Sequence, residues 1–350
     1  MIKIFTSLLP VFIFLLILIY LDSYKLVKIK TLLILIVVGF VAAIISYFLN
    51  KYLLDKFSFD LTNYSRYISP IIEEFLKSVF VFYLIYKKKI GFMVDAAIYG
   101  FAVGAGFAFI ENIYYLNVVD NSSIFLWIIR GFGTAIMHGG TTAIFAIITK
   151  NLFDRADNLK LKNYLPQSIF RLLNKPGILY IMPGLIVAII IHSIFNHLLL
   201  PAFVITVLQL IILPLLITIT FYISERTLKE WMETGLDNDV KLLEQIDEGI
   251  FSETNAGQYL SSLQDKFTGT VVADMLCLIK IHVELAIKAK GVLLMRKGGL
   301  QVIVEDEVKE KLNELKYLEK SIGPVGKLAV SPIFHMSTKD LWQLYFLGLK

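Results

Sequence analysis

The stretch SPIIEEFLKSVF, residues 69–80, places Glu73, Glu74 and Lys77 inside an apolar run that otherwise has the composition of a membrane-spanning helix. An ionisable side chain near the centre of such a helix costs about 2.5–3.5 kcal/mol on insertion scales. Residues of this kind usually face the interior of a helix bundle and mark a functional site. The stretch therefore predicts a membrane helix bundle with a polar site inside it.

The composition of the whole chain also indicates a membrane protein. Of its 350 residues, 57% are hydrophobic and 18% are charged, and the mean hydropathy is +0.70. We therefore expect a polytopic protein embedded in the lipid bilayer. No basic run is interleaved with aromatic residues, which argues against a nucleic-acid partner. The single cysteine, Cys277, cannot form a disulfide within the chain.

Apolar runs of about 20 residues, the length a helix needs to cross the hydrocarbon core, recur along the first two thirds of the chain. They predict an all-α fold, a bundle of about seven transmembrane helices within residues 1–223. The first run is expected to be a retained helix, because no small-x-small cleavage site follows it. The runs span residues 2–22, 30–50, 70–87, 91–117, 123–149, 177–200 and 202–223.

Residues 224–350 differ in character, since charged and amphipathic segments replace the apolar runs. Val308, Leu312, Leu315 and Leu318 recur at helical spacing, which predicts one apolar face on a solvated helix. We expect a soluble helical domain that carries no catalytic constellation. Its role is left open, with a cytoplasmic partner as one interpretation.

Lysine and arginine are distributed unevenly between the loops, and this bias orients the chain. Because cation-rich loops remain in the cytoplasm, we expect the N-terminus outside and the C-terminal domain in the cytoplasm, in a cell (plasma or inner) membrane. The alternate loops hold only Lys51, Lys56 and Arg66. The cation-rich loops hold Lys25, Lys28, Lys30, Lys87, Lys88, Lys89, Lys150, Arg155, Lys160, Lys162, Arg171 and Lys175.

With this orientation, polar residues from several helices lie in the outer half of the membrane. At 1.5 Å per residue, Glu74 lies about 6 Å from the outer end of its helix, and Glu111 and His192 lie about 13 Å from theirs. His138 lies deeper, about 22 Å from Ser123, so only a tilted or bent helix brings it near the others.

Helix faces support the same convergence. Small residues (Ala97, Gly100, Gly104 and Ala108) share a face with Glu111, so this carboxylate should point into the bundle. His192 and Asn196 are four residues apart and share a face. Glu73 and Glu74 are about 100° apart, so one should act directly and the other should support it. Lys77 is spaced to pair with either carboxylate.

Structural roles are the competing interpretation for each of these residues taken alone. Glu73 and Lys77 could be an ion pair near the interface, and a single buried histidine often only joins two helices. Arg130 and Asp95 lie nearer helix ends, where a role as an anchor or a partner is simpler than a catalytic one. The convergence of carboxylates and histidines on several helices favours a functional site.

Four motifs, in this order on successive helices, resemble the PrsW family of intramembrane proteases, which is related to the CAAX prenyl protease and bacteriocin-processing (CPBP) group. EEFLK fits E-E-x-x-K, FAFIEN fits F-x-x-x-E-N, IMHGGTT contains a histidine, and HSIFN fits H-x-x-x-N. The resemblance covers about residues 30–225. The wider group carries E-E-x-x-x-R and F-x-x-x-H, so the prenyl-protease branch fits less well.

The resemblance implies an intramembrane endopeptidase that cleaves a membrane-anchored protein near the outer leaflet, similar to enzymes that cut anti-sigma factors. Glu73 or Glu74 would be the general base, and histidine and amide groups would stabilise the oxyanion. The supporting residues would be Lys77, Asn112 and Phe107. The implied catalytic residues are Glu73, Glu74, Glu111, His138, His192 and Asn196.

Zinc is the one cofactor that these residue types could hold. The candidate ligands are Glu74 (or Glu73), Glu111, His138 and His192. No H-E-x-x-H motif is present, and a nearby lysine would repel a divalent ion. The sequence therefore narrowly favours a metal-independent, glutamic-type peptidase with no cofactor.

Two other classes of function remain as alternatives. Carboxylates and histidines in mid-membrane also form proton relays, so a proton- or ion-coupled transporter is one of them. The internal repeat that carriers often show is not evident. The second is a seven-helix receptor or scaffold that signals through its cytoplasmic domain.

The loop cations generate a testable topology. Reporters fused after Asp120 should read outside, and reporters fused after Lys160 should read inside, because the positive-inside bias sets orientation. Paired alkaline phosphatase and fluorescent-protein fusions measure this. The reverse pattern would move the polar cluster to the inner leaflet and remove the argument for cleavage on the outer side.

Overall fold

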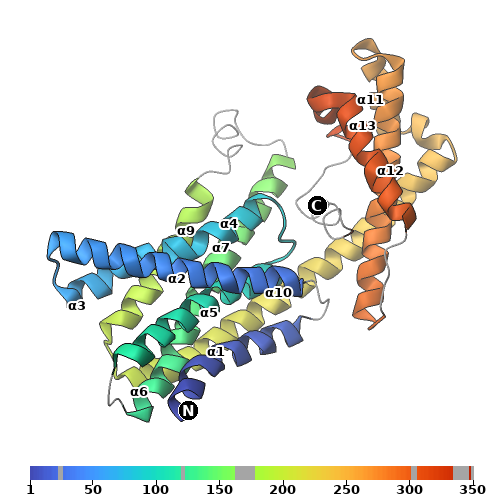
Figure 1. Cartoon of the computed structure of the whole chain (residues 1–350). Helices are drawn as coiled ribbons and strands as arrows, with labels where there is room; N and C mark the ends of the chain where they lie inside the picture. Colours follow the sequence, from blue (N-terminus) through green and yellow to red (C-terminus); the bar gives the residue numbers. More distant parts are fainter. Residues whose placement is uncertain (23–26, 120–122, 162–177, 301–305, 334–346, 348–350) are drawn as a thin grey trace. The chain divides into compact units, whose positions relative to one another are not determined.

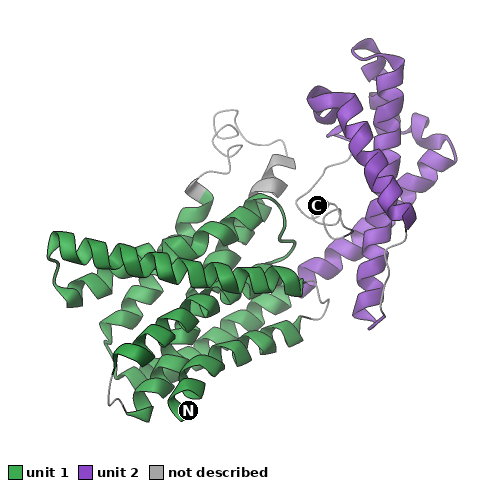
Figure 2. Cartoon of the chain, in the orientation of Figure 1, with its two compact units in different colours: residues 1–224 green, residues 225–350 purple. Residues whose placement is uncertain are grey.

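The computed structural model describes residues 1–22, 27–119, 123–161, 178–300, 306–333 and 347 (Figure 1). Every regular element in these ranges is helical, which confirms the all-α prediction. The chain divides into two compact units, Met1–Ser224 and Glu225–Lys350 (Figure 2). Several predicted loop residues lie outside the described ranges: Lys25, Asp120, Lys162, Arg171 and Lys175.

The first unit is a bundle of long apolar helices. Six helical runs in the described residues are long and apolar enough to cross a membrane, which confirms a multi-pass membrane protein. The expected seventh, α4, falls outside this set because Glu73, Glu74 and Lys77 lie within its 18 residues. The elements are α1 (Ile2–Leu21), α2 (Ile29–Phe57), α3 (Leu61–Asn63), η1 (Tyr64–Ile68), α4 (Ser69–Tyr86), α5 (Met93–Val118), α6 (Ile124–Ile128), η2 (Ile129–Thr134), α7 (Ala135–Leu161), α9 (Ile178–His197) and α10 (Ala202–Asp247).

Helix α5 lies at the core of this bundle, where it packs against α1, α2, α4 and α7 (Figure 1). Its small-residue face allows the close approach that the sequence predicts. A Cβ added to Gly104 would lie 2.1 Å from the carbonyl oxygen of His138, so only glycine fits at this crossing. A Cβ on Gly106 would likewise lie 2.2 Å from the carbonyl oxygen of Ile36 on α2. These contacts place α5 directly against the backbones of its neighbours.

Two π-helical segments, η1 and η2, immediately precede α4 and α7. A π-helix has a wider turn than an α-helix, so it changes the direction in which the following side chains point. Such insertions are frequent at functional sites. Here they lie directly before the helices that carry Glu73, Glu74 and His138.

The second unit is built from helices with one apolar face. Val308, Leu312, Leu315 and Leu318 are all buried, which confirms the predicted face of α13. The chain kinks within this element at Gly323, whose φ of 66° suits glycine. The elements of this unit after α10 are η3 (Ile250–Glu253), α11 (Asn255–Ser262), η4 (Leu263–Asp265), α12 (Gly269–Lys297) and α13 (Asp306–Val330).

Polar groups inside the second unit are used for packing. The Lys290 ammonium lies 2.5 Å from Asp239 and 5.1 Å from the ring of Trp231, which joins α12 to the last part of α10. Burial lowers the pKa of His282 to about 4, so this side chain is neutral near pH 7. Among the described residues of this unit, no three His, Cys, Asp or Glu side chains converge on one point.

Candidate active site

Glu74 is buried and accepts three donors through one oxygen. Its Oε1 lies 2.6 Å from Lys77 Nζ, 2.8 Å from His192 Nδ1 and 3.0 Å from Thr141 Oγ1. The donors come from α4, α9 and α7, so this carboxylate joins three helices. The buried ammonium of Lys77 matches the charge of Glu74. This environment suits a residue that supports the fold and orients its neighbours.

Lys77 fixes the protonation of His138. Its ammonium, which is charged because it pairs with Glu74, lies 3.2 Å from His138 Nδ1. An ammonium has no lone pair, so Nδ1 must accept this hydrogen bond and Nε2 must carry the ring proton. We assign the Nε2–H as the donor to Glu111 Oε2, which lies 2.8 Å away.

Arg130 holds the other side of Glu111. Its guanidinium lies 3.3 Å from Glu111 Oε1, and its Nε donates to Asn112 Oδ1 at 2.9 Å. The guanidinium also stacks 3.8 Å from the centre of the Tyr115 ring. Asn112 donates in turn to the carbonyl oxygen of Ser7 at 2.7 Å. From sequence, Arg130 was expected to be an anchor or a partner near a helix end, and no spacing pattern linked it to Glu111 in particular.

Glu73 differs from its neighbour because its side chain remains 14% exposed. Ser69 donates to its Oε1 at 2.5 Å, and Asn50 donates to Ser69 Oγ at 3.1 Å. Its Oε2 lies 3.8 Å from His192 Nε2. Glu73 is therefore held at one oxygen while the other faces the histidine across a gap.

Glu73 and Glu111 both line a polar groove with a cavity volume of about 720 Å³. Its walls come from α2, α3, η1, α4 and α5. Phe107 of α5 is one of the lining residues. Glu74 and Lys77 do not line it. The groove thus exposes two of the three carboxylates and leaves the Glu74–Lys77 pair behind them.

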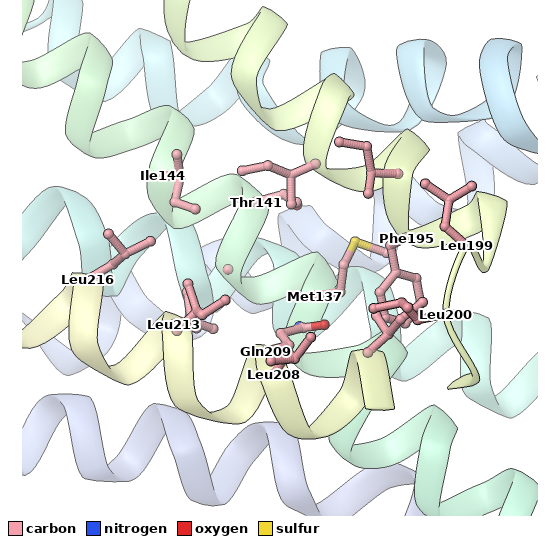
Figure 3. Close-up of a pocket in the computed structure, with 15 residues that line it drawn as sticks. Met137, Thr141, Ile144, Phe195, Leu199, Leu200, Leu208, Gln209, Leu213 and Leu216 are labelled. Carbon is pink, nitrogen blue, oxygen red and sulfur yellow. The ribbon is translucent and has the colours of Figure 1, made fainter. Parts of the chain in front are cut away.

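A second cavity of about 470 Å³ lies among α7, α9 and α10 (Figure 3). Apart from Thr141 and Gln209, its lining residues are apolar, and Met137, Leu213 and Leu216 are among those labelled. Thr141 also donates to Glu74, so it separates this cavity from the ionisable cluster. Neither Glu73 nor Glu111 lines it, which makes the polar groove the open side of the site.

The structure brings together most of the residues singled out from sequence. The rings of His138 and His192 are 4.9 Å apart and perpendicular. Phe107 lies beside both His138, at 5.0 Å between rings, and Lys77, at 5.1 Å. Asn196, by contrast, donates to the carbonyl oxygen of Ser65 at 2.8 Å and so supports η1.

The side chains of Glu73, His138 and His192 could together hold a metal ion. Each offers one ligand atom, and the three atoms lie within 4.8 Å of one another. Two histidines and one carboxylate match a catalytic zinc site in number and kind. The hydrogen bond between His192 Nδ1 and Glu74 also matches the carboxylate that zinc-binding histidines usually contact through their other ring nitrogen. Of the candidate ligands suggested by the sequence, this set contains Glu73, His138 and His192, and it leaves out Glu74 and Glu111.

A multi-pass bundle with buried, paired carboxylates and histidines defines a class of membrane protein with an internal catalytic site. Residues 26–222 match the family described as PrsW family intramembrane metalloprotease. This match covers more than half of the chain, so the chain belongs to that family and is an intramembrane protease; the resemblance seen in the sequence is confirmed. Comparison with curated proteins and with solved structures gives no match.

The Glu74–Lys77 pair predicts a specific stability pattern. Lys77→Met should lower stability by roughly 3–5 kcal/mol, because it leaves a buried carboxylate without its counter-charge. The double variant Glu74→Gln/Lys77→Met should recover much of this loss, since no charge is then left unpaired. Thermal unfolding in detergent measures both, with Lys51→Met as an exposed control. Equal destabilisation in the single and double variants would contradict the pairing.

Proposed function

We propose that this chain is a glutamic-type intramembrane endopeptidase that cleaves a membrane-anchored protein near the outer leaflet, as in regulated cleavage of anti-sigma factors. The observation that carries the proposal is the unequal environment of two adjacent carboxylates. Glu74 is buried and accepts three donors, whereas Glu73 lines the groove, remains 14% exposed and accepts one close side-chain donor, Ser69. The loop cations support the outer position of this groove.

Glu73 and His192 are spaced to hold the attacking water. Glu73 Oε2 and His192 Nε2 are 3.8 Å apart, a separation that a water molecule can bridge. His192 Nδ1 donates to Glu74, so in the neutral ring Nε2 is an acceptor. A water between them can donate one proton to each acceptor and direct a lone pair at a substrate carbonyl.

Peptide hydrolysis then needs one proton to move through Glu73. As the water oxygen bonds to the carbonyl carbon, Glu73 takes a proton and the carbonyl becomes an oxyanion. The oxyanion collapses, the C–N bond breaks, and Glu73 gives its proton to the leaving nitrogen. Glu73 returns to a carboxylate, and the products are an acid and an amine.

His138 is the donor that we assign to the oxyanion. Its proton is held on Nε2 by Lys77. In the free enzyme that N–H donates to Glu111, and we propose that it turns to the oxyanion when the substrate binds. Asn196 was the other expected donor, but its amide is bound to Ser65. Glu111 and Arg130 position His138. Arg130 holds the Glu111 carboxylate, and the His138 ring faces that carboxylate. A preorganised donor of this kind typically contributes about 3–4 kcal/mol to the transition state.

The family description names a metalloprotease, and Glu73, His138 and His192 are the residues that would hold the ion. Zinc bound there would lower the pKa of its water to about 7 and polarise the carbonyl. The Lys77 contact favours the metal-independent form instead. With Lys77 donating to Nδ1 and the proton on Nε2, neither nitrogen of His138 has a lone pair free for a metal.

Replacing Glu73 should lower the cleavage rate without lowering the stability of the fold. Glu73→Gln is expected to lower the cleavage rate by about 10²–10⁴-fold, the usual contribution of a general base, while the thermal stability changes little. Purified protein in liposomes with single-span membrane substrates provides the assay. Glu225→Gln is the matched control, because this exposed carboxylate does not line the groove. Wild-type cleavage by Glu73→Gln would remove the proposed base.

The metal-independent form predicts little bound zinc. Protein purified without chelator should contain well under one zinc per chain by elemental analysis, and phenanthroline should leave cleavage unchanged. The physical reason is that His138 has no ligand atom to offer while Lys77 donates to it. One zinc per chain, with activity lost on chelation and restored by zinc, would replace the glutamic mechanism and leave the protease assignment intact.

A further inference from the structure

The Ser69 hydroxyl joins the candidate base to a residue of another helix. Ser69 Oγ lies 2.5 Å from Glu73 Oε1 and 3.1 Å from Asn50 Nδ2 on α2. The Asn50 side chain makes two more hydrogen bonds, with Ser46 Oγ at 3.1 Å and with the Tyr64 hydroxyl of η1 at 2.8 Å. Tyr64, Asn50, Ser69 and Glu73 therefore form a continuous series of side-chain hydrogen bonds, which we call the Asn50 network.

The shortest of these hydrogen bonds determines the direction of the others. A separation of 2.5 Å between two oxygens is typical of a hydroxyl that donates to a carboxylate. Glu73 has to be ionised to act as a base, so the proton between the two oxygens belongs to Ser69. Because Ser69 has no other proton, its oxygen accepts from Asn50, and an amide donates only through its nitrogen. The amide oxygen of Asn50 therefore faces Tyr64, which donates to it.

The opposite orientation of the Asn50 amide would break the bond to Glu73. The amide oxygen would then face Ser69 and accept its proton. Ser69 would turn a lone pair toward Glu73, and two oxygens at 2.5 Å with no proton between them repel each other. Tyr64 selects the observed orientation, because its hydroxyl donates to the amide oxygen.

The Asn50 network holds Glu73 in the position that the proposed reaction needs. Ser69 binds Oε1, while Oε2 lies 3.8 Å from His192 Nε2, where we place the attacking water. The terminal torsion of a glutamate is broad, so without Ser69 the carboxylate would rotate and aim neither oxygen at this water. A misplacement of about 1 Å at a reacting group can lower the rate roughly 100-fold.

We propose that Asn50 and Ser69 are positioning residues for peptide hydrolysis: Asn50 orients the Ser69 hydroxyl, and Ser69 holds Glu73 with Oε2 facing His192. This inference rests on the proposed protease function and adds two residues that none of the four sequence motifs contains. Asn50 lies on α2, whereas the motifs lie on α4, α5, α7 and α9. Because both residues act through Glu73, their loss should lower kcat and leave KM nearly unchanged.

Replacing Ser69 tests the bond that holds the base. In the liposome assay, Ser69→Ala should lower kcat at least about ten-fold, because Glu73 is then free to rotate. Ser69→Thr retains a hydroxyl and should recover most of this loss. Ser78→Ala is the matched control, since this serine lies on the same helix, donates to the carbonyl oxygen of Phe75 and does not line the groove. Wild-type kcat in Ser69→Ala would overturn the positioning role.

A double-mutant cycle tests whether Asn50 acts through Ser69. Asn50→Ala should lower kcat at least about ten-fold in the wild-type background but less than about two-fold in Ser69→Ala, where the contact is already lost. Asn50→Asp should also lower kcat, because a carboxylate accepts the Ser69 proton in place of Glu73. Asn117→Asp, at an exposed position of α5, controls for the added charge. Equal losses from Asn50→Ala in both backgrounds would overturn the network.

Infrared difference spectra report on Glu73 without any cleavage. The carboxylate stretching band that Glu73→Gln removes should shift in Ser69→Ala and in Asn50→Ala, because a hydrogen bond to the carboxylate is lost, and should not shift in Ser78→Ala. An unshifted band overturns the network whether or not the protein cleaves. A shifted band without wild-type cleavage keeps the network and rejects the proposed protease mechanism. Cleavage that needs Glu73 but neither Ser69 nor Asn50 keeps the mechanism and rejects the positioning role.

Discussion

The ion pair between Lys77 and Glu74 is the interaction on which the rest of the site depends. Both charges are buried in a bundle that offers little water, so each needs the other. The pair sets the direction of two rings: Glu74 accepts from His192 Nδ1, and Lys77 donates to His138 Nδ1. The close crossing at Gly104 then brings the helix of Glu111 near enough for the 2.8 Å contact with His138.

The two adjacent carboxylates show how one turn of helix can supply opposite environments. Successive residues point about 100° apart, so Glu73 and Glu74 cannot share surroundings. Glu74 turns toward α7 and α9 and is covered by donors, whereas Glu73 turns toward the groove and is held through Ser69. A carboxylate with its lone pairs engaged makes a rigid support, and a less engaged one remains available to move a proton.

The helical bundle and most of the site follow from sequence, because they depend on composition and on helical spacing. Glu111 was expected to face inward from its small-residue neighbours, and it does. The approach of His138 to the other site residues had no such basis, since the π-helix η2 that precedes its helix leaves no periodic signal. The contacts of Arg130 and Asn196 could not be predicted for a related reason. Their partners come from elements distant in sequence, so only the folded chain shows that one reaches Glu111 and the other Ser65.

The two cavities differ in the polarity of their lining residues, so the site has a polar side and an apolar side. Thr141 lies between the apolar cavity and Glu74, and the polar groove lies against Glu73 and Glu111. Water needs polar partners to occupy a cavity, so it reaches the cluster from the groove. In the proposed mechanism the substrate uses the same side, because the attacking water and the peptide bond would have to meet at Glu73. The uneven distribution of polar residues around the Glu74–Lys77 pair is thus the feature from which we infer where hydrolysis takes place.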